Sequence, residues 1–201
     1  MNSLFIICLI LQTGSGTKSV EIDEQKFGVK LTLETTVYEE GEEIKREIKI
    51  VKLGEKLRID ETFPNSEEIG QVVIWNGKEC KLFLPNHNPQ LTTPIRNGMD
   101  FIGFREDVKE KGVKWEIDNV TRLPSRKETA HEITQFKDYV MIEGFGLFPN
   151  VIERYEAQKL LLHTELKHTD KEIDISPNVF DIESVKFSEA AKKLADKVRP
   201  E

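Results

Sequence analysis

The side chains best suited to chemistry in this sequence are four histidines, His87, His131, His163 and His168. Imidazole binds zinc well, but a zinc site needs several ligands close together in space. His163 and His168 lie five residues apart in an alternating strand pattern. Because successive side chains of a strand alternate between faces, this spacing predicts that the two point to opposite sides of a sheet. We therefore expect surface histidines and no metal site.

The cysteines and the remaining motifs offer no nucleophile. Cys80 lies in an apolar strand pattern with no histidine beside it in sequence, and Cys8 lies inside an N-terminal apolar run. A reactive cysteine needs a neighbouring base or positive charge, so we expect Cys80 to be a small core residue. The sequence contains no glycine-rich phosphate loop and no Gly-x-Ser-x-Gly turn. These observations predict a protein that is not an enzyme and uses no cofactor.

Size and charge narrow the class of partner. The chain has 201 residues, which suits one domain with a short appendage. Its 29 Lys and Arg against 36 Asp and Glu give a net charge of -7. An acidic chain is repelled by nucleic-acid phosphates and by anionic lipid surfaces, so we expect no nucleic-acid partner.

The N-terminus differs in character from the rest of the chain. Leu4 to Leu11 is an unbroken apolar run, and small or polar residues follow it as far as Gly16. This order is typical of a secretory signal, and the run is too short for a membrane span of about 20 residues. We expect residues 1–16 to be a signal peptide and residues 17–201 to be one domain exported to the periplasm or cell envelope. A short buried N-terminal strand is the alternative, because residues 1–3 carry no positive charge.

From Val29 onward, apolar and polar side chains alternate, which is typical of strands with one apolar face. Asn76 and Gly77 stand between two apolar runs and predict a hairpin with a type I′ turn. Successive hairpins of this kind predict a strongly curved antiparallel sheet with one apolar face. The strand residues expected to bind ligand on that face are Leu31, Leu33, Ile48, Ile50, Leu57, Ile59, Val72, Ile74, Leu82 and Trp115.

Helices are expected to cover the apolar face. Phe101 and Phe104 belong to a helical spacing that predicts a lid helix over about residues 95–110, and a second helix is expected over about residues 188–199, after the N-cap Ser188. A Phe left in water forgoes roughly 1.5–3 kcal/mol of burial, so a loosely fitting lid is stable only with an apolar ligand beneath it. The alternative is that both aromatic residues belong to an ordinary closed core.

The order of several motifs resembles the LolA-like family of outer-membrane lipoprotein-sorting proteins. The motifs lie between about Val29 and Ile182, and they are Lys56-Leu57-Arg58-Ile59, Val72-Val73-Ile74-Trp75-Asn76-Gly77-Lys78, Leu82-Phe83-Leu84-Pro85, Leu123-Pro124-Ser125-Arg126-Lys127-Glu128, Asp138-Tyr139, Glu143-Gly144, Leu147-Phe148-Pro149, Ile152-Glu153 and Ile173-Asp174-Ile175-Ser176-Pro177-Asn178-Val179-Phe180. The resemblance implies a mainly β (α+β) fold, an unclosed β-barrel covered by helices. Family members usually begin with a long amphipathic helix, whereas only Thr17 to Phe27 is available here, and the helix after Ser188 is expected to take part in the cover.

Three functions remain open at this stage. The resemblance implies a periplasmic carrier or chaperone for lipoprotein acyl chains or another lipid, working with inner-membrane or outer-membrane lipoprotein-handling proteins. An envelope sensor or regulatory module, binding a lipoprotein or protein partner on the same half-barrel, is the second. A lipid hydrolase is the third, and the sequence offers it no nucleophile with a base.

Overall fold

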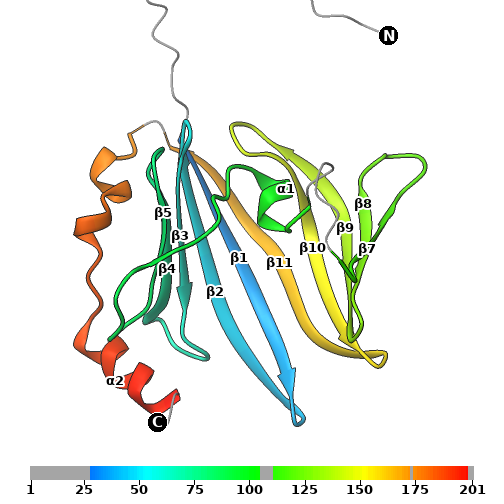
Figure 1. Cartoon of the computed structure of the whole chain (residues 1–201), viewed down its shortest axis with the longest axis horizontal. Helices are drawn as coiled ribbons and strands as arrows, with labels where there is room; N and C mark the ends of the chain where they lie inside the picture. The colour runs from blue at the N-terminus through cyan, green and yellow to red at the C-terminus, as the bar shows by residue number, and fades with distance from the viewer. Residues whose placement is uncertain (1–27, 105–110, 173, 199–201) are drawn as a thin grey trace, which may run out of the picture.

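The computed structural model describes residues 28–104, 111–172 and 174–198, and these form one sheet with short helices around it (Figure 1). The expected signal peptide and part of the expected lid helix lie outside the described residues. Eleven antiparallel strands make the sheet: β1 (Gly28–Glu39), β2 (Glu42–Leu53), β3 (Lys56–Thr62), β4 (Ile69–Trp75), β5 (Cys80–Phe83), β6 (Gln90–Leu91), β7 (Lys114–Ile117), β8 (Pro124–Glu128), β9 (Glu132–Ile142), β10 (Gly146–Glu156) and β11 (Lys159–Glu172).

The strand order is simple and has one long-range pairing. It runs β6-β5-β4-β3-β2-β1-β11-β10-β9-β8-β7, so nearly every neighbour in the sheet is also a neighbour in sequence. The exception is the seam in the centre, where β1 pairs with β11 along most of its length. The molecule therefore consists of two meanders, each built of hairpins, joined at that seam.

Turn chemistry fixes the registers of the hairpins. Glu40 and Gly41 both have positive φ, 49° and 90°, and join β1 to β2 with Glu39 opposite Glu42. The prediction of a type I′ turn at Asn76 and Gly77 is wrong, although the predicted hairpin is present. Gly77 has a φ of 94°, whereas Asn76 uses its side-chain oxygen to accept hydrogen bonds from the backbone N–H groups of residues 78 and 79. The result is a longer loop.

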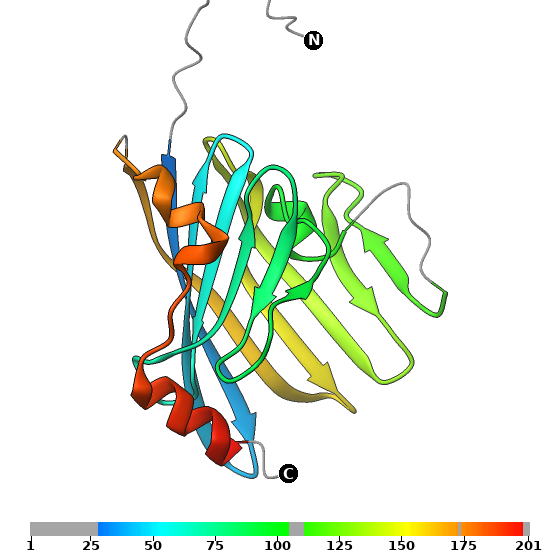
Figure 2. The ribbon, with the colours of Figure 1, turned by 60° about the vertical axis from the view of Figure 1, so that its left-hand side comes forward.

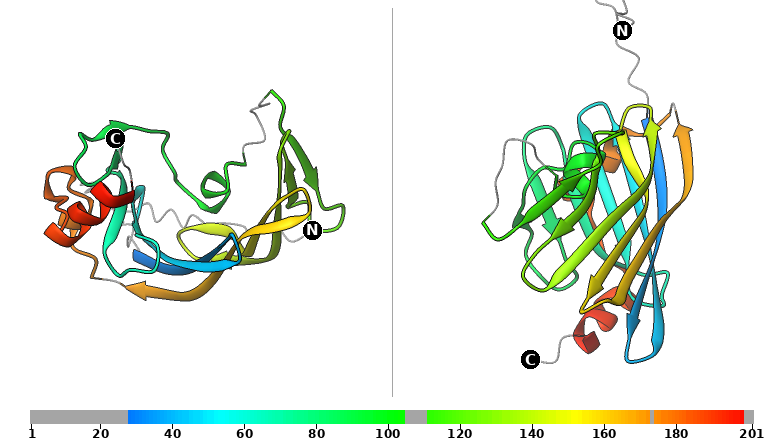
Figure 3. Two further views of the ribbon diagram at one scale, coloured as in Figure 1. Left: turned by 90° about the horizontal axis from the view of Figure 1, so that it is seen from below. Right: turned by 90° about the vertical axis from the view of Figure 1, so that its right-hand side faces the viewer.

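The sheet bends into a trough (Figure 3). Seen from below, the two wings rise on either side of the β1–β11 seam, and their edges, β6 and β7, do not pair with each other. Each strand presents alternate residues to the inside and outside of the trough. The curved, open antiparallel sheet predicted from the sequence is confirmed.

The segment that crosses the inside of the trough holds only a short helix. It comprises residues 92–104, and we call it the crossing segment. Within it, α1 (Gly98–Phe101) is a single turn, capped by the Asn97 side chain, which accepts a hydrogen bond from the Asp100 N–H. Gly103, with a φ of 74°, ends it. The described part of the predicted lid helix is therefore much shorter than expected, because these local stop signals outweigh the apolar spacing.

Two 3-10 helices lie on the far side of the sheet (Figure 2). The 3-10 helices η1 (Pro177–Phe180) and η2 (Ile182–Ser184) pack on the outer face of β3 to β5 with Phe180 buried beneath them, in a cluster that includes Val72 and Phe83. Helix α2 (Glu189–Val198) follows the expected cap, since Ser188 Oγ accepts from the Ala191 N–H at 2.9 Å. The helix was expected to take part in the cover. It packs at the end of the β3–β4 hairpin, where Ser188 contacts Glu68, and its Ala195 borders a cavity beside Arg46 and Glu61.

Candidate ligand-binding site

The inside of the trough carries a compact apolar cluster, which we call the concave cluster. Its most deeply buried members are almost inaccessible to solvent: Leu31 and Leu33 are 1% exposed, and Leu57 is 0% exposed. Cross-strand pairing explains why they meet, because Leu31 lies opposite Ile50, and Ile50 lies opposite Ile59. The buried members are Val29, Leu31, Leu33, Ile50, Leu57, Ile59, Val73, Cys80, Ile142, Phe145 and Phe148.

The crossing segment covers this cluster. Ile95 and Phe101 pack against it, and the Phe101 ring lies 5.4 Å from the Phe148 ring. The segment is anchored on the turn between β9 and β10, since the Gly98 N–H donates to the Phe145 carbonyl at 3.2 Å. A methyl group on Gly98 would lie 2.1 Å from the Leu147 carbonyl oxygen, so only glycine permits this close approach.

A second aromatic group lies near the β7 edge of the sheet. Trp115 on β7 stacks on Phe136 of β9 at 5.6 Å, and the Phe104 ring meets Trp115 edge-on at 5.1 Å. The Lys127 ammonium lies 5.2 Å from the Trp115 ring centroid, within the range of a cation–π contact. The Thr92 N–H donates to the Cys80 carbonyl on β5 at 3.0 Å, and the Phe104 ring contacts Trp115 on β7, so the crossing segment bridges the two wings.

The structure brings together most of the predicted ligand-binding residues. Five are buried in the concave cluster: Leu31, Leu33, Ile50, Leu57 and Ile59. Three more are half-buried and pack against it: Ile48, Leu82 and Phe101. Phe104 and Trp115 belong to the second aromatic group.

Val72 and Ile74 were assigned to the wrong face. They lie on the outer side of β4, in the cluster under η1 and η2. Val73 lies opposite Ile59 and Trp75 lies opposite Leu57, so these two residues face the trough instead. The sequence here is an unbroken apolar run, because this part of β4 is buried on both faces. Alternation therefore could not show which phase faces inward.

Sequence reasoning also missed the contribution of β10. Phe145 and Phe148 are 1% and 0% exposed and form the floor beneath α1. Pro149 directly follows them, and proline disfavours a strand that pairs on both sides. The sequence signal for these two core residues was the run Phe145-Gly146-Leu147-Phe148, with two aromatic residues three positions apart.

Below the concave cluster the trough becomes polar. Arg46 forms an ion pair with Glu61 at 3.1 Å, and the hydroxyls of Thr35 and Thr164 are hydrogen-bonded at 2.9 Å across the seam. Arg46 and Glu61 also line a small, partly open cavity of about 160 Å³, together with Pro85 and with Ala195 of α2. This polar row borders the concave cluster on its lower side.

Cys80 is buried at the edge of the concave cluster. It is 3% exposed, and burial raises the pKa of its thiol, an effect only partly offset by the backbone hydrogen bond from Ile95. A raised pKa keeps the sulfur protonated and unreactive at neutral pH. Cys80 is therefore a core residue that touches the crossing segment.

A bulge in β11 corrects the prediction for two of the histidines. His163 pairs with Thr36 and His168 pairs with Thr32, and these two threonines share the outer face of β1. The register shifts between Thr32 and Leu33, so β11 has one extra residue at this point. His163 and His168 consequently lie on the same face and not on opposite faces.

The two histidines nevertheless have separate partners. His163 Nδ1 lies 3.4 Å from Glu153, and His168 Nε2 lies 2.9 Å from Asp170. Among the residues that the structure describes, no three His, Cys, Asp or Glu side chains are grouped to hold a metal ion.

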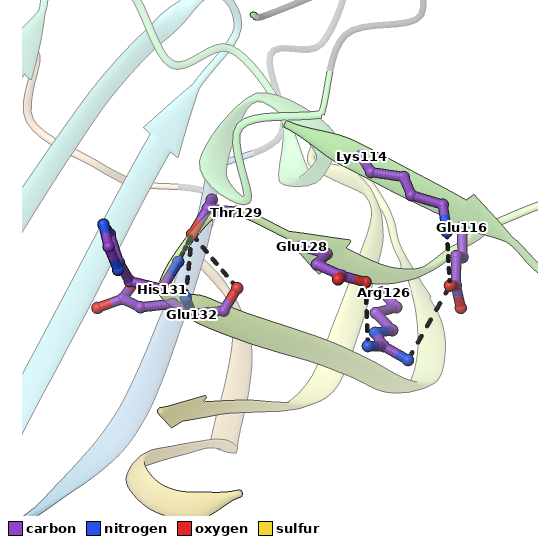
Figure 4. A network of polar contacts seen from close by, with 7 residues as sticks. All are labelled: Lys114, Glu116, Arg126, Glu128, Thr129, His131 and Glu132. Atoms are coloured by element: carbon purple, nitrogen blue, oxygen red, sulfur yellow. Dashed lines mark hydrogen bonds and ion pairs between the residues drawn. The ribbon is translucent and has the colours of Figure 1, made fainter. Parts of the chain in front are cut away.

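The outside of the β7–β9 wing is lined with ion pairs (Figure 4). Arg126 lies between Glu116, at 4.0 Å, and Glu128, at 3.1 Å, and Lys114 reaches Glu116 at 3.7 Å. Beyond them, Thr129 Oγ1 accepts hydrogen bonds from the backbone N–H groups that begin the turn into β9. Charges on an edge strand discourage pairing with another chain, so this network protects the free edge at β7.

Comparisons with known proteins agree on the fold. No family model and no curated protein matches the sequence. A domain described as an outer membrane lipoprotein-sorting protein domain of Vibrio parahaemolyticus matches at 11% identity and a TM-score of 0.53, covering 79% of this chain and 91% of that one. A DUF1329 family protein from Desulfovibrio piger matches at 9% identity and a TM-score of 0.52, covering 81% and 93%. A LolA superfamily protein from Nitrosomonas europaea is 16% identical over 80% and 91%, with a TM-score of 0.49.

The likeness to the first two structures confirms the fold that the motif order predicts, a curved antiparallel sheet that does not close into a barrel. At these identities the likeness concerns the fold alone. No helix within the described residues is long and apolar enough to cross a membrane.

Proposed function

We propose that this protein is an exported, non-catalytic carrier or chaperone that holds an apolar ligand, a lipid or the acyl chain of a lipoprotein, in the trough of its half-barrel. One observation carries the proposal. Within the described residues, the apolar concave cluster is covered from inside by the crossing segment, which has a single helical turn, and not by a second sheet or a layer of long helices. A cover of this kind can be displaced at small cost, because it makes few regular hydrogen bonds.

The contacts of the crossing segment suit exchange with a ligand. Phe101 is only half-buried, and its ring meets Phe148 on the floor of the trough. An acyl chain entering at this point replaces one apolar contact by another, so the concave cluster stays shielded from water. Burying apolar area contributes about 25 cal/mol per Å², which is enough for useful affinity without any polar anchor.

The direct test is to identify what the protein binds. Protein purified from a bacterial envelope is analysed by native mass spectrometry, and an organic extract is analysed for lipid. Lipid bound in stoichiometric amount is the expected result. Absence of extractable lipid, together with failure to bind a fluorescent fatty acid, would contradict the proposal.

A double variant separates a displaceable cover from a closed core. Replacing Phe101 and Phe104 by Ala is expected to weaken fluorescent fatty acid binding about tenfold, or about 1.4 kcal/mol, with little change in the melting temperature of the ligand-free protein. Leu91→Ala is the matched control, because Leu91 is 77% exposed on β6. A large fall in the ligand-free melting temperature would show that the two rings belong to a static core.

A sensor or regulatory module that binds a protein partner is the second candidate. It is favoured by exposed apolar side chains at the free edges of the sheet, Leu91 on β6 and Ile117 on β7. Free strand edges are a common surface for adding a strand from another chain. A partner that is captured by the wild type but lost when both residues are changed to Lys would support this function, whether or not lipid is bound.

A further inference from the structure

The apolar inner surface of β2 and β3 ends at an ion pair. Alternate residues of a strand share a face, so Ile50, Ile48 and Arg46 follow one another down the inner face of β2. Ile50 is buried in the concave cluster, and Ile48 packs against that cluster. On β3, Glu61 lies opposite Ile48 and forms an ion pair with Arg46 at 3.1 Å. The Arg46–Glu61 pair therefore stands directly below the concave cluster.

A second apolar space lies beyond the pair. The cavity of about 160 Å³ that the pair lines has mostly apolar walls on its other sides, among them Phe63, Pro85 and Ala195. Leu82 packs against the concave cluster, and Leu84, two residues later, lines the cavity. A cavity of about 150 Å³ in another protein holds one benzene molecule, so this one has room for about four to six carbon atoms. The ion pair thus stands between two apolar spaces.

The pair is a barrier to an apolar chain. The Arg46 and Glu61 side chains are 37% and 25% exposed, so both charges still touch water. An apolar chain in contact with them would displace that water, and the desolvation of an ion pair costs more than the burial of one methylene group gains. A longer chain therefore stabilises the complex only until its end meets the pair.

The opposite end of the concave cluster is reached from solvent. Strands β10 and β11 pair no further up than Val151 and Glu165, and a cleft of about 500 Å³ lies where their pairing stops. Val29 and Ile142, two buried members of the concave cluster, line this cleft. The polar end of an amphiphile can stay in water here, and its apolar end then points down the trough toward the Arg46–Glu61 pair.

We propose that the Arg46–Glu61 ion pair is a stop that sets the length of the acyl chain accepted by the trough. This inference rests on the proposed function and adds a chain-length preference to it. The methyl end of the chain meets the pair, and the polar end lies toward the β10–β11 cleft. Carbon atoms beyond this length find no apolar surface to bury, so they add no affinity.

The wild type provides the first test. Saturated fatty acids that differ by two carbons, each below its critical micelle concentration, displace a fluorescent fatty acid from the full protein. The affinity is expected to rise about tenfold with each step and then to level off. A rise that continues to the longest soluble chain would overturn the stop and leave the proposed function standing. If no chain of any length binds, the proposed function fails as well.

Removing the pair is expected to lengthen the accepted chain. Arg46→Met combined with Glu61→Leu leaves no unpaired charge, and replacing an ion pair by apolar side chains of similar size is often neutral for stability. The chain length at which affinity levels off should increase by about four to six carbons, the room in the cavity. Arg126→Met with Glu128→Leu is the matched control, because this pair has the same 3.1 Å separation on the outer face. An unchanged limit, or the same increase in the control, would contradict the stop.

Two further measurements locate the end of the chain. Ala195→Phe, added to the double variant, fills the cavity and is expected to restore the wild-type limit, whereas a limit that stays extended would count against the stop. In the wild type, a fatty acid with a diazirine next to its methyl end is irradiated and its cross-links are mapped by mass spectrometry. Cross-links to Ile48, Arg46 or Glu61 are expected. Cross-links confined to the cleft, at residues 140–143 and 166–171, would reverse the orientation and overturn the proposal.

Discussion

At the scale of single residues, Cys80 is a probe of the crossing segment. Its thiol is buried, with a raised pKa, and its one backbone hydrogen bond comes from Ile95 in that segment. In a chain that starts at Thr17, Cys80 is also the only cysteine. A thiol reagent therefore reaches it only when the crossing segment lifts.

We expect Cys80 to react slowly at neutral pH, and to react faster as the pH rises into the alkaline range, because the thiolate forms later than in a free cysteine. An opening free energy of about 1.4 kcal/mol already slows labelling tenfold relative to the unfolded chain. Stopped-flow labelling of the native protein and of protein in urea provides the comparison. Equal rates in the two samples would contradict a closed cover.

Other residues mark where sequence reasoning reached its limit. Alternation assigned Leu31, Leu33 and Ile50 correctly, because polar residues between them point to water on the outer face. It failed for Val72 and Ile74, where η1 and η2 bury the outer face of β4. Which residues of β4 face the trough depends on the segment that covers its outer face. That segment lies about a hundred positions later in the chain, so a local sequence pattern does not reveal it.

At the scale of elements, α1 depends on one close contact. Gly98→Ala places a methyl group against the Leu147 carbonyl oxygen, so α1 has to move away from β10. We expect a loss of about 1–3 kcal/mol in the free energy of unfolding, as for other overpacked sites, with faster hydrogen exchange at the Gly98 position and faster labelling of Cys80.

Gly70→Ala is the control for this change. Its added methyl group would meet the Phe63 ring at 3.1 Å, and a side chain can yield where a backbone carbonyl cannot. We expect normal exchange in α1 and normal labelling of Cys80 in this variant. Urea unfolding and amide exchange measure both proteins, and indistinguishable behaviour of the two would argue against the anchoring role of Gly98.

The helices show which elements local sequence can predict. The bounds of helix α2 agree closely with the predicted ones, because its N-cap and its ends are determined by residues close to them in sequence. The described part of the lid was overestimated, since the spacing of Phe101 and Phe104 reflects contacts with Phe148 and Trp115 rather than one continuous helical face. The location of α2 beside the β3–β4 hairpin depends on tertiary contacts, which no local signal specifies.

At the scale of the whole molecule, the two wings are held together by the β1–β11 seam. Thr35 and Thr164 are both 5% exposed, and their hydroxyls bond each other across it. Thr35→Val leaves the Thr164 hydroxyl buried without that partner, so we expect a loss of about 1–2 kcal/mol in the free energy of unfolding. The double change to Val removes both polar groups and is expected to be nearly neutral.

Guanidinium unfolding of the wild type, both single variants and the double variant measures this coupling. A favourable coupling energy of about 1 kcal/mol is expected for two residues in direct contact. Additive losses would mean that each hydroxyl finds water in the folded protein and that the seam gains nothing from their bond.

The single long-range pairing of the sheet also sets the order in which the protein can fold. Each hairpin forms between neighbouring strands, but Thr35 and Thr164 are separated by 129 residues, so the seam closes late and at a larger entropic cost. Until then β1 carries an open edge beside the apolar side chains of Leu31 and Leu33, a surface on which other chains can aggregate. We expect a chain that ends before β11 to aggregate, whereas a chain that ends just before α2 remains monomeric. Light scattering of the two shortened chains measures the difference. A monomeric chain without β11 would show that the open edge of β1 does not cause aggregation.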